Sequence, residues 1–218
     1  QEVQGQRRCV VDAQVTPVVI VGDCRREPWI DRLVDALPNP HVRLDRSQQG
    51  ALSTHIRALR FAQAVGVRCI IMEDDAIPVV DFLPRAQAWF DRFPDDLISF
   101  YLGGGRPVRW QAMVDSKIRH ADADGQDAIT LSTLLHGVCY SIPPADIPRV
   151  LENLRDPQHQ AADYAIGAAY GRPVIYPVES LVQHRDGPVV ERHPDGQART
   201  ERRVARRLAG PLMYEGDP

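Results

Sequence analysis

The sequence lacks the signatures of several large protein classes. Neither the phosphate-binding pattern GxxxxGK, completed by Ser or Thr, nor the dinucleotide-binding pattern GxGxxG occurs in it. No apolar run approaches the roughly 18 residues that a membrane-spanning helix requires. These absences argue against a P-loop nucleotidase, a GxGxxG dehydrogenase and a transmembrane segment within this sequence.

Cysteine is scarce, and its four positions form no CxxC pair. Cys69 and Cys139 lie inside apolar runs, whereas disulfide frameworks and zinc sites use regularly spaced cysteines. The charged, proline-interrupted start of the chain also makes a poor signal peptide. We therefore expect reduced thiols and a cytoplasmic protein.

Lysine is nearly absent too, since Lys117 is the only one among 26 basic residues. The net charge of −3 argues against a polyanion-binding surface over the whole molecule. A length of 218 residues, 44% of them apolar and 25% charged, is typical of one soluble globular domain. We predict a polar leader over 1–15, one domain over 16–198 and a basic tail over 199–218.

The predicted tail is rich in arginine, and two roles fit it. Its charge suits an anionic surface such as nucleic acid, a membrane or an acidic glycan. Alternatively, Val204 and Leu208 share one face of a helix and would dock the tail on the domain. The five arginines, within nine positions, are Arg199, Arg202, Arg203, Arg206 and Arg207.

The order of apolar runs predicts an α/β domain in which helices flank a mostly parallel central sheet. Continuous β-branched runs predict buried strands, and apolar residues at helical spacing predict the helices between them. Residues 106–130 carry polar and acidic loop signals. Strands are expected over 17–22, 41–44, 70–72, 96–102, 134–142, 174–177 and 180–184, and helices over 28–37 and 50–65, from Phe82, after Pro144 and from Asp163.

Three consecutive carboxylates, Glu73, Asp74 and Asp75, follow the apolar residues 70–72. Like charges in a row are unfavourable unless a positive group lies among them, and hard divalent cations take oxygen ligands. In an open α/β sheet, ligands bind at the carboxyl ends of the strands. The stretch therefore predicts either a cation site or a solvated turn after a core strand.

Six stretches follow one another at suitable spacing within residues 16–190. They are Gly50–His55, Glu73–Ala76, Asp96–Gly103, Gly137–Ile142, Asp163 and Pro177–His184. In this order they resemble glycosyltransferase family 25, the lipooligosaccharide-type transferases. The first stretch departs from the family pattern at Thr54, where serine is usual.

The resemblance implies a single GT-A (Rossmann-like) domain and a metal-dependent, inverting hexosyltransferase. Such an enzyme moves a hexose from a nucleotide sugar, here expected to be a UDP-sugar, to an acceptor hydroxyl, first of all on a glycan and also on a protein. The arginine-rich tail adds a hydroxylated base of DNA as a further candidate acceptor. The acidic stretch is then a variant of the DXD motif. Its carboxylates would hold Mn²⁺ or Mg²⁺, which neutralises the leaving diphosphate.

Alternation along an extended chain places Glu73 and Asp75 on one side as metal ligands. Asp74 then points the other way, toward donor hydroxyls. The resemblance adds His184 as a further metal ligand; the alternative is an exposed loop histidine.

Arg25 and Arg26 follow the first strand, where GT-A folds receive the nucleotide. Guanidinium groups suit phosphate, so both are expected to bind the donor, and a solvated charge pair is the alternative. His55 would touch the nucleotide sugar or else pack its helix against the sheet.

Asp163 is the candidate general base for the acceptor hydroxyl. Its alternative role is to cap the helix that starts there. Trp110, expected in a loop, His136 and Tyr140 are candidates for the acceptor pocket. The alternative for Trp110 is a hydrophobic loop anchor, and the alternative for Tyr140 is packing in the core.

Two other functions remain open from the sequence. The first is a non-catalytic module that binds a nucleotide sugar or nucleic acid on a transferase scaffold, and it predicts binding without turnover. The second is a Mg²⁺-dependent phosphoryl-transfer enzyme or nuclease that uses the same acids, and it predicts activity on phosphoesters without a sugar donor.

Overall fold

The computed structural model describes residues 15–157, 161–185 and 203–214, so most of the predicted leader and part of the predicted tail lie outside the described residues. Strands and helices alternate through much of the chain. The strands are β1 (Val18–Asp23), β2 (His41–Asp45), β3 (Ile70–Glu73), β4 (Ala76–Pro78), β5 (Ile98–Ser99), β6 (Ala128–Leu131), β7 (Cys139–Ser141), β8 (Val174–Pro177) and β9 (Val182–His184). The helices are α1 (Glu27–Ala36), α2 (Ala51–Val65), α3 (Phe82–Arg92), α4 (Val108–Ala123), α5 (Ile147–Asn153) and α6 (Ala162–Tyr170), with 3-10 turns η1 (Cys24–Arg26) and η2 (Pro144–Asp146).

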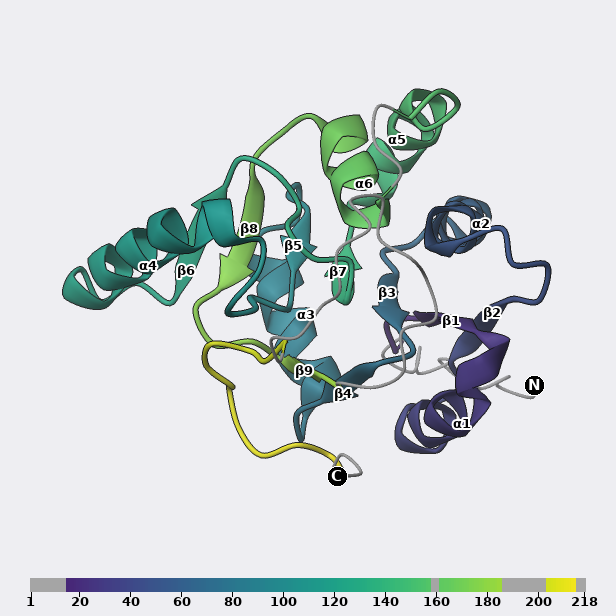
Figure 1. Cartoon of the computed structure of the whole chain (residues 1–218), viewed down its shortest axis with the longest axis horizontal. Helices are drawn as coiled ribbons and strands as arrows, with labels where there is room; N and C mark the ends of the chain where they lie inside the picture. The colour runs from purple at the N-terminus through teal and green to yellow at the C-terminus, as the bar shows by residue number, and fades with distance from the viewer. Residues whose placement is uncertain (1–14, 158–160, 186–202, 215–218) are drawn as a thin grey trace, which may run out of the picture.

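Seven strands form the central sheet in the order β2-β1-β3-β7-β5-β8-β6 (Figure 1). Five of them run in the same direction, while β7 and the edge strand β6 run the opposite way. β4 and β9 form a separate antiparallel pair. The predicted α/β domain with a mostly parallel central sheet is confirmed.

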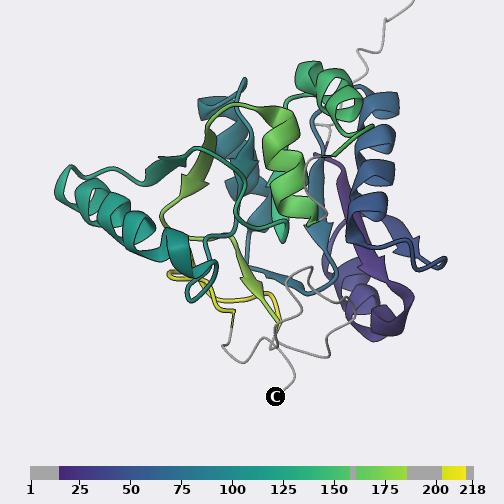
Figure 2. The ribbon, with the colours of Figure 1, turned by 45° about the horizontal axis from the view of Figure 1, so that its top comes forward.

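Helices cover both faces of this sheet because alternate strand residues point to opposite sides. Val18 and Ile20 of β1 belong to a buried cluster with residues of α1 and α3, whereas Val19 and Val21 belong to a second cluster with residues of α2, α4, α5 and α6. Residues of β3 alternate in the same way. The result is a Rossmann-like arrangement of three layers, which Figures 1 and 2 show from two directions.

The prediction of loops over 106–130 is wrong, because this stretch forms α4 and β6. The buried side of α4 is narrow, consisting of Val114, Ile118 and Ala121. Polar residues around this narrow stripe conceal the helical period in the sequence. Trp110 therefore lies in the first turn of a helix and not in a loop.

Residues 203–214 lie along the domain without forming the expected helix. Single bridges join this segment to Val79, Gly103 and Ser180, and Leu208 packs on the core cluster that contains α1 and α3. Arg206 pairs with Asp115 of α4, and Arg207 pairs with Asp122. This part of the tail therefore docks on the domain, as one alternative predicted, but through isolated strand-like bridges and not as a helix.

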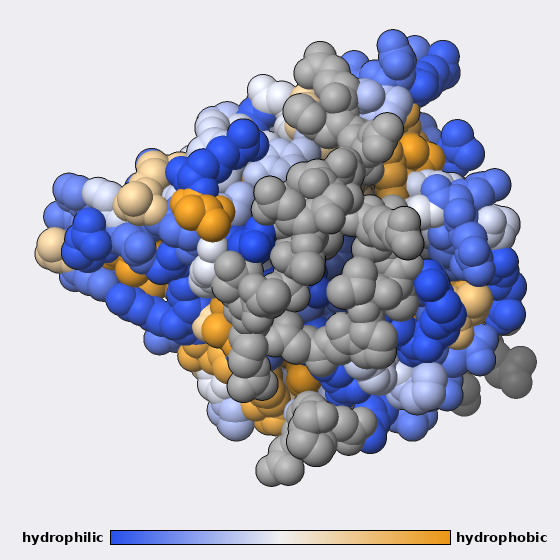
Figure 3. All heavy atoms as spheres, in the orientation of Figure 1, coloured by the Kyte–Doolittle hydropathy of each residue, from blue (hydrophilic) through white to orange (hydrophobic). Residues whose placement is uncertain are grey.

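The helix surfaces that face outward are mostly hydrophilic, as Figure 3 shows over α4 and α2. Within the described ranges, no helix combines the length and the apolar character needed to cross a bilayer.

Gly167 provides a test of the packing between α6 and the loop before β7. A methyl group added there would lie 2.7 Å from the backbone nitrogen of Leu134 and would also meet Thr133 Oγ1. Backbone at that distance cannot yield cheaply, so Gly167→Ala is expected to lower the free energy of unfolding by about 1–3 kcal/mol. Urea unfolding measures this loss. Gly104→Ala is the control, because its nearest new contact is 3.7 Å and no comparable loss is expected; equal losses in the two variants would contradict the packing argument.

Candidate functional site

The predicted site residues meet along the edge of the sheet that is formed by the carboxyl ends of its parallel strands. β1 and β2 end there at Asp23 and Asp45, which are paired, and β3 ends at Glu73, which is paired with Val21 of β1. β7 runs the other way, so its start lies at the same edge, where the backbone N–H of Glu73 donates to Val138 O at 2.8 Å. His184 of β9 lies opposite Ala76. The edge therefore unites chain segments that are more than a hundred residues apart.

Arg26 supplies the positive charge among the acids. Arg26 is the last residue of η1, and its side chain is buried. Its Nη1 lies 2.8 Å from both Asp74 Oδ1 and Asp75 Oδ2. Asp74 also accepts the backbone N–H of Asp23 through Oδ2 at 2.8 Å. Arg25, in contrast, is exposed and binds Asp23. The two adjacent arginines, both predicted to bind the donor, thus differ in environment.

The predicted alternation along 73–75 is wrong. β3 ends at Glu73, and residues 74–75 form a turn before β4. Asp74 and Asp75 therefore share one guanidinium, while Glu73 contacts His55 instead. Side-chain alternation applies only while the backbone remains extended.

The two buried aspartates differ in acidity. Burial and the neighbouring Asp75 raise the pKa of Asp74 to about 7, against the opposing effect of Arg26. Burial alone would raise the pKa of Asp75 as well, but His184, Arg26 and the charge of Arg203 outweigh it and hold this pKa below its usual range. Asp75 is thus the permanent anion of the pair at neutral pH.

His184 lies beside Asp75, with Nε2 at 3.3 Å from Asp75 Oδ2. It is buried and is not the exposed loop histidine of the alternative. Tyr101 contacts both His184 and His136, with ring centroids 6.1 and 5.1 Å apart. Burial and the charges of His184 and Arg203 lower the pKa of His136 to about 3, so His136 is neutral at physiological pH.

His55 is fully buried and contacts Glu73 and Tyr140 through its two ring nitrogens. A carboxylate only accepts hydrogen bonds, so Nε2 donates to Glu73 Oε1 at 3.2 Å, and Nδ1 accepts from Tyr140 Oη at 3.0 Å. A methyl group at Gly137 would lie 2.8 Å from Glu73 Oε1, which keeps this position free of a side chain. His55 therefore packs its helix against the sheet, as the alternative to a donor contact predicted. Glu73 remains partly exposed at the site.

Asp163 lies in the first turn of α6, on the other side of Glu73. Its Oδ1 accepts the N–H of Tyr164 at 2.8 Å, and the helix cap itself is Ala161. Burial raises the pKa of Asp163 to about 7, the Glu73 charge adds to this rise, and the Tyr164 N–H opposes it. A carboxyl with this pKa is half ionised at neutral pH and suited to proton transfer.

Trp110 is half-buried and lies near the start of α6. The Arg109 guanidinium lies 5.9 Å from the Trp110 ring and 5.4 Å from the Tyr164 ring, which brings α4 beside Asp163. Trp110 Nε1 is buried and has no hydrogen-bond partner among the described residues. The predicted acceptor residue Trp110 therefore lies on the Asp163 side of the site, and His136 lies on the His184 side.

Sequence reasoning missed Trp29 and Arg185. The guanidinium carbons of Arg26 and Arg185 both lie 4.9 Å from the centre of the Trp29 ring, and the Arg185 N–H donates to Asp75 O at 2.7 Å. The available signals were weak: Trp29 follows Pro28 in a first helical turn, and Arg185 follows His184. Only the tertiary contact between Arg185, just after β9, and Trp29 in the first turn of α1 brings them together.

The described side chains on their own do not form the expected Mn²⁺ or Mg²⁺ site. No group of three or more His, Cys, Asp or Glu residues is placed to hold a metal within 15–157, 161–185 and 203–214. Asp74 and Asp75 share Arg26, and Glu73 is directed to His55. Asp75 Oδ1 is the one atom of this motif that is buried without a hydrogen-bond partner in the described chain. The cation stays a prediction.

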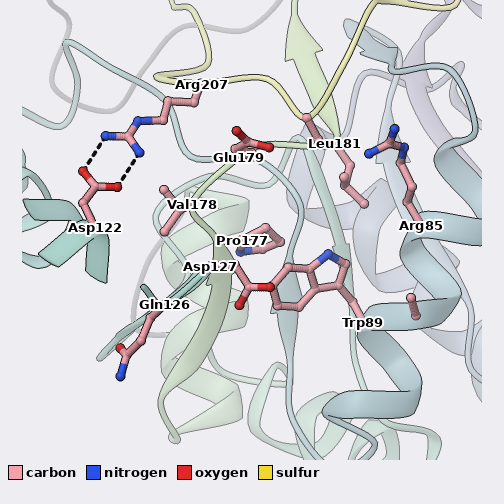
Figure 4. A pocket seen from close by; sticks show the side chains of 12 residues that line it. Arg85, Trp89, Asp122, Gln126, Asp127, Pro177, Val178, Glu179, Leu181 and Arg207 are labelled. Carbon is pink, nitrogen blue, oxygen red and sulfur yellow. Dashed lines mark hydrogen bonds and ion pairs between the residues drawn. The ribbon is translucent and has the colours of Figure 1, made fainter. Parts of the chain in front are cut away.

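A separate pocket of about 490 Å³ lies between α3, the β8–β9 connection and residues 203–214 (Figure 4). Arg85, Trp89 and Glu179 are among its lining residues, and the Arg207–Asp122 ion pair lies at its edge. None of the residues predicted for the site lines this pocket.

Comparisons with known proteins show the architecture alone. No family model matches the sequence, and no curated protein matches it. Among solved structures, the chain is similar to A197 from STIV, with a TM-score of 0.52 and 12% sequence identity over 93% of this chain and 100% of that chain. This similarity therefore concerns the fold.

Proposed function

We propose that this chain is a glycosyltransferase that takes a hexose from a nucleoside diphosphate sugar, with a UDP-sugar as the first candidate, and passes it to an acceptor hydroxyl. One observation carries the proposal. Asp163, a carboxyl with a pKa of about 7, lies close to Glu73 at the sheet edge that also holds Arg26, Asp75 and His184. A proton acceptor thus lies next to an arginine-containing site at the carboxyl ends of parallel strands, where such folds bind ligands.

The proposed reaction is a single displacement. The acceptor hydroxyl gives its proton to the Asp163 carboxylate while its oxygen bonds to the anomeric carbon of the sugar. The bond from that carbon to the diphosphate breaks, and the diphosphate leaves with the electron pair. Attack opposite to the leaving group inverts the anomeric centre.

The surrounding residues would position these groups. His55 holds Glu73 beside Asp163, and the negative charge of Glu73 favours the protonated form of Asp163 after the transfer. Trp110 offers an indole face and a buried N–H for an acceptor on the same side. Arg26 would stabilise the charge that develops on the leaving diphosphate.

A donor screen tests this function. The chain is incubated with UDP-, GDP-, CDP-, ADP- and dTDP-sugars, together with oligosaccharide, hydroxylated peptide and hydroxymethylated DNA acceptors. Released nucleoside diphosphate is then measured. We expect one donor to be consumed faster when an acceptor is present.

Different outcomes separate the alternatives. Binding of a nucleotide sugar without any consumption would favour the non-catalytic module. Cleavage of phosphoesters in the absence of a sugar donor would favour the phosphoryl-transfer enzyme.

A further inference from the structure

The acidic motif lies in surroundings rich in positive charge, which is the opposite of what a divalent cation requires. Asp74 and Asp75 share the guanidinium of Arg26. Arg185 donates its backbone N–H to Asp75 O, and its guanidinium lies against the same Trp29 ring as that of Arg26. Arg203 is close enough for its charge to lower the pKa of both Asp75 and His136. More guanidiniums than carboxylates therefore surround Asp75, and such a cluster attracts anions.

From this arrangement we infer that Arg26 and Arg185, both placed against Trp29, bind the diphosphate of the donor directly and take the place of the expected divalent cation. The inference rests on the proposed function, because it names the groups that would hold the leaving diphosphate. Asp74 and Asp75 then act as positioning residues that orient Arg26.

Arg185 provides the independent sign of a missing anion. It is only 6% exposed, and its Nη1 is buried without a hydrogen-bond partner among the described residues. Leaving a charged donor buried and unmatched is costly, so native proteins supply such groups with a partner. Its contact with the Trp29 ring attracts the cation but gives no hydrogen-bond acceptor.

The geometry around Trp29 suits a diphosphate. Guanidinium groups bind phosphate oxygens in bidentate fashion, and they are more easily desolvated than ammonium groups. Arg26 comes from η1 and Arg185 from the end of β9, so the two groups approach the same place from separate segments. The two aspartates hold Arg26, and the indole of Trp29 lies against both guanidiniums before any ligand arrives, which lowers the entropy cost of binding.

Isothermal titration calorimetry tests the inference. UDP, GDP, CDP, ADP, dTDP and inorganic pyrophosphate are titrated into the full chain, once with EDTA and once with Mn²⁺. We expect a nucleoside diphosphate and pyrophosphate to bind in EDTA, with dissociation constants within about threefold of those in Mn²⁺, a difference below 1 kcal/mol.

Variants assign the binding to the arginines. Arg185→Gln is expected to weaken binding in EDTA by about tenfold or more, because a charge-assisted contact is lost, and Arg185→Lys is expected to restore part of it. Arg92→Gln is the matched control. Arg92 also lies over an indole, at 5.3 Å from Trp89, and pairs with a carboxylate, Asp127, but it is not part of this cluster.

The outcomes are distinct. Binding that requires Mn²⁺ would overturn the inference and leave the proposed function standing. Absence of binding to every nucleoside diphosphate in both buffers would overturn the proposed function, and the inference with it. Unchanged affinity in Arg185→Gln would also overturn the inference, and the wild-type titration in EDTA decides the matter even if that variant does not fold.

Discussion

Replacing Asp163 with asparagine is expected to lower the rate of sugar transfer by about 10²- to 10⁴-fold, the usual contribution of a general base. Asparagine has nearly the same shape but cannot take the proton of the acceptor hydroxyl. The affinity for the nucleoside diphosphate should remain, because the proposed role of Asp163 is at the acceptor hydroxyl. Initial rates of nucleoside diphosphate release, measured with saturating donor and acceptor, give the effect.

The pH dependence identifies the same group. Because the pKa of Asp163 is raised to about 7, the carboxylate needed as a base is lost as the pH falls through about 7, and the wild-type rate should fall with it. Asp127→Asn, at an exposed ion pair, serves as the control and should keep both rate and profile. A wild-type rate that does not change between pH 6 and 8 would contradict the assignment of Asp163.

Stability distinguishes this variant from a merely damaged one. The folded-state pKa of Asp163, about 7, lies well above that of an aspartate in the unfolded chain, so its ionisation reduces the stability of the folded chain as the pH rises from about 4 through about 7. Asparagine does not ionise. The thermal midpoint of Asp163→Asn should therefore exceed that of the wild type at pH 8 and lie closer to it at pH 4.

Replacing Arg26 with glutamine is expected to destabilise the fold by about 3–5 kcal/mol, because two buried carboxylates lose their shared cation. For a chain of this size the thermal midpoint should fall by roughly 6–20 °C. The loss should be smaller at pH 5 than at pH 8. The raised pKa of Asp74, about 7, means that Asp74 is protonated at the lower pH and no longer adds a second buried negative charge.

Arg25→Gln is the matched control for this experiment. Arg25 is the adjacent residue and also pairs with an aspartate, Asp23, but it is exposed. Its replacement should change the thermal midpoint very little, since exposed ion pairs contribute little to stability. Equal changes in the two variants would contradict the central position of Arg26.

The sheet was predictable where strands are buried on both faces. The run over 17–22 and the residues before Glu73 are uniformly apolar because both faces of β1 and β3 are covered. α4 was missed because three buried residues among polar neighbours carry too weak a period. β7 was predicted too long, since only Cys139–Ser141, near the end of the predicted strand over 134–142, pair with neighbouring strands.

The sequence predicts where the site lies but not which side chains contact one another in it. Strand ends gather carboxylates at one edge, and Asp75 and His184 lie together there. Their contacts depend on tertiary structure that no local pattern encodes. The turn at 74–75 directs Asp75 toward Arg26, and the packing of α2 brings His55 to Glu73. A long-range contact between the chain after β9 and the first turn of α1 places Arg185 on Trp29.

The bridges of residues 203–214 have a consequence for folding during synthesis. They join Val79 to Leu212, Gly103 to Ala205 and Ser180 to Leu208, and two of these pairs span more than a hundred positions. Such long-range contacts close slowly and cannot begin until the late segment has left the ribosome. In a nascent chain, β1, α2 and β3 can therefore form first. The bridges beside β4 and β9 form only after residues 203–214 have been synthesised. Competence for binding should appear late and abruptly as the chain lengthens.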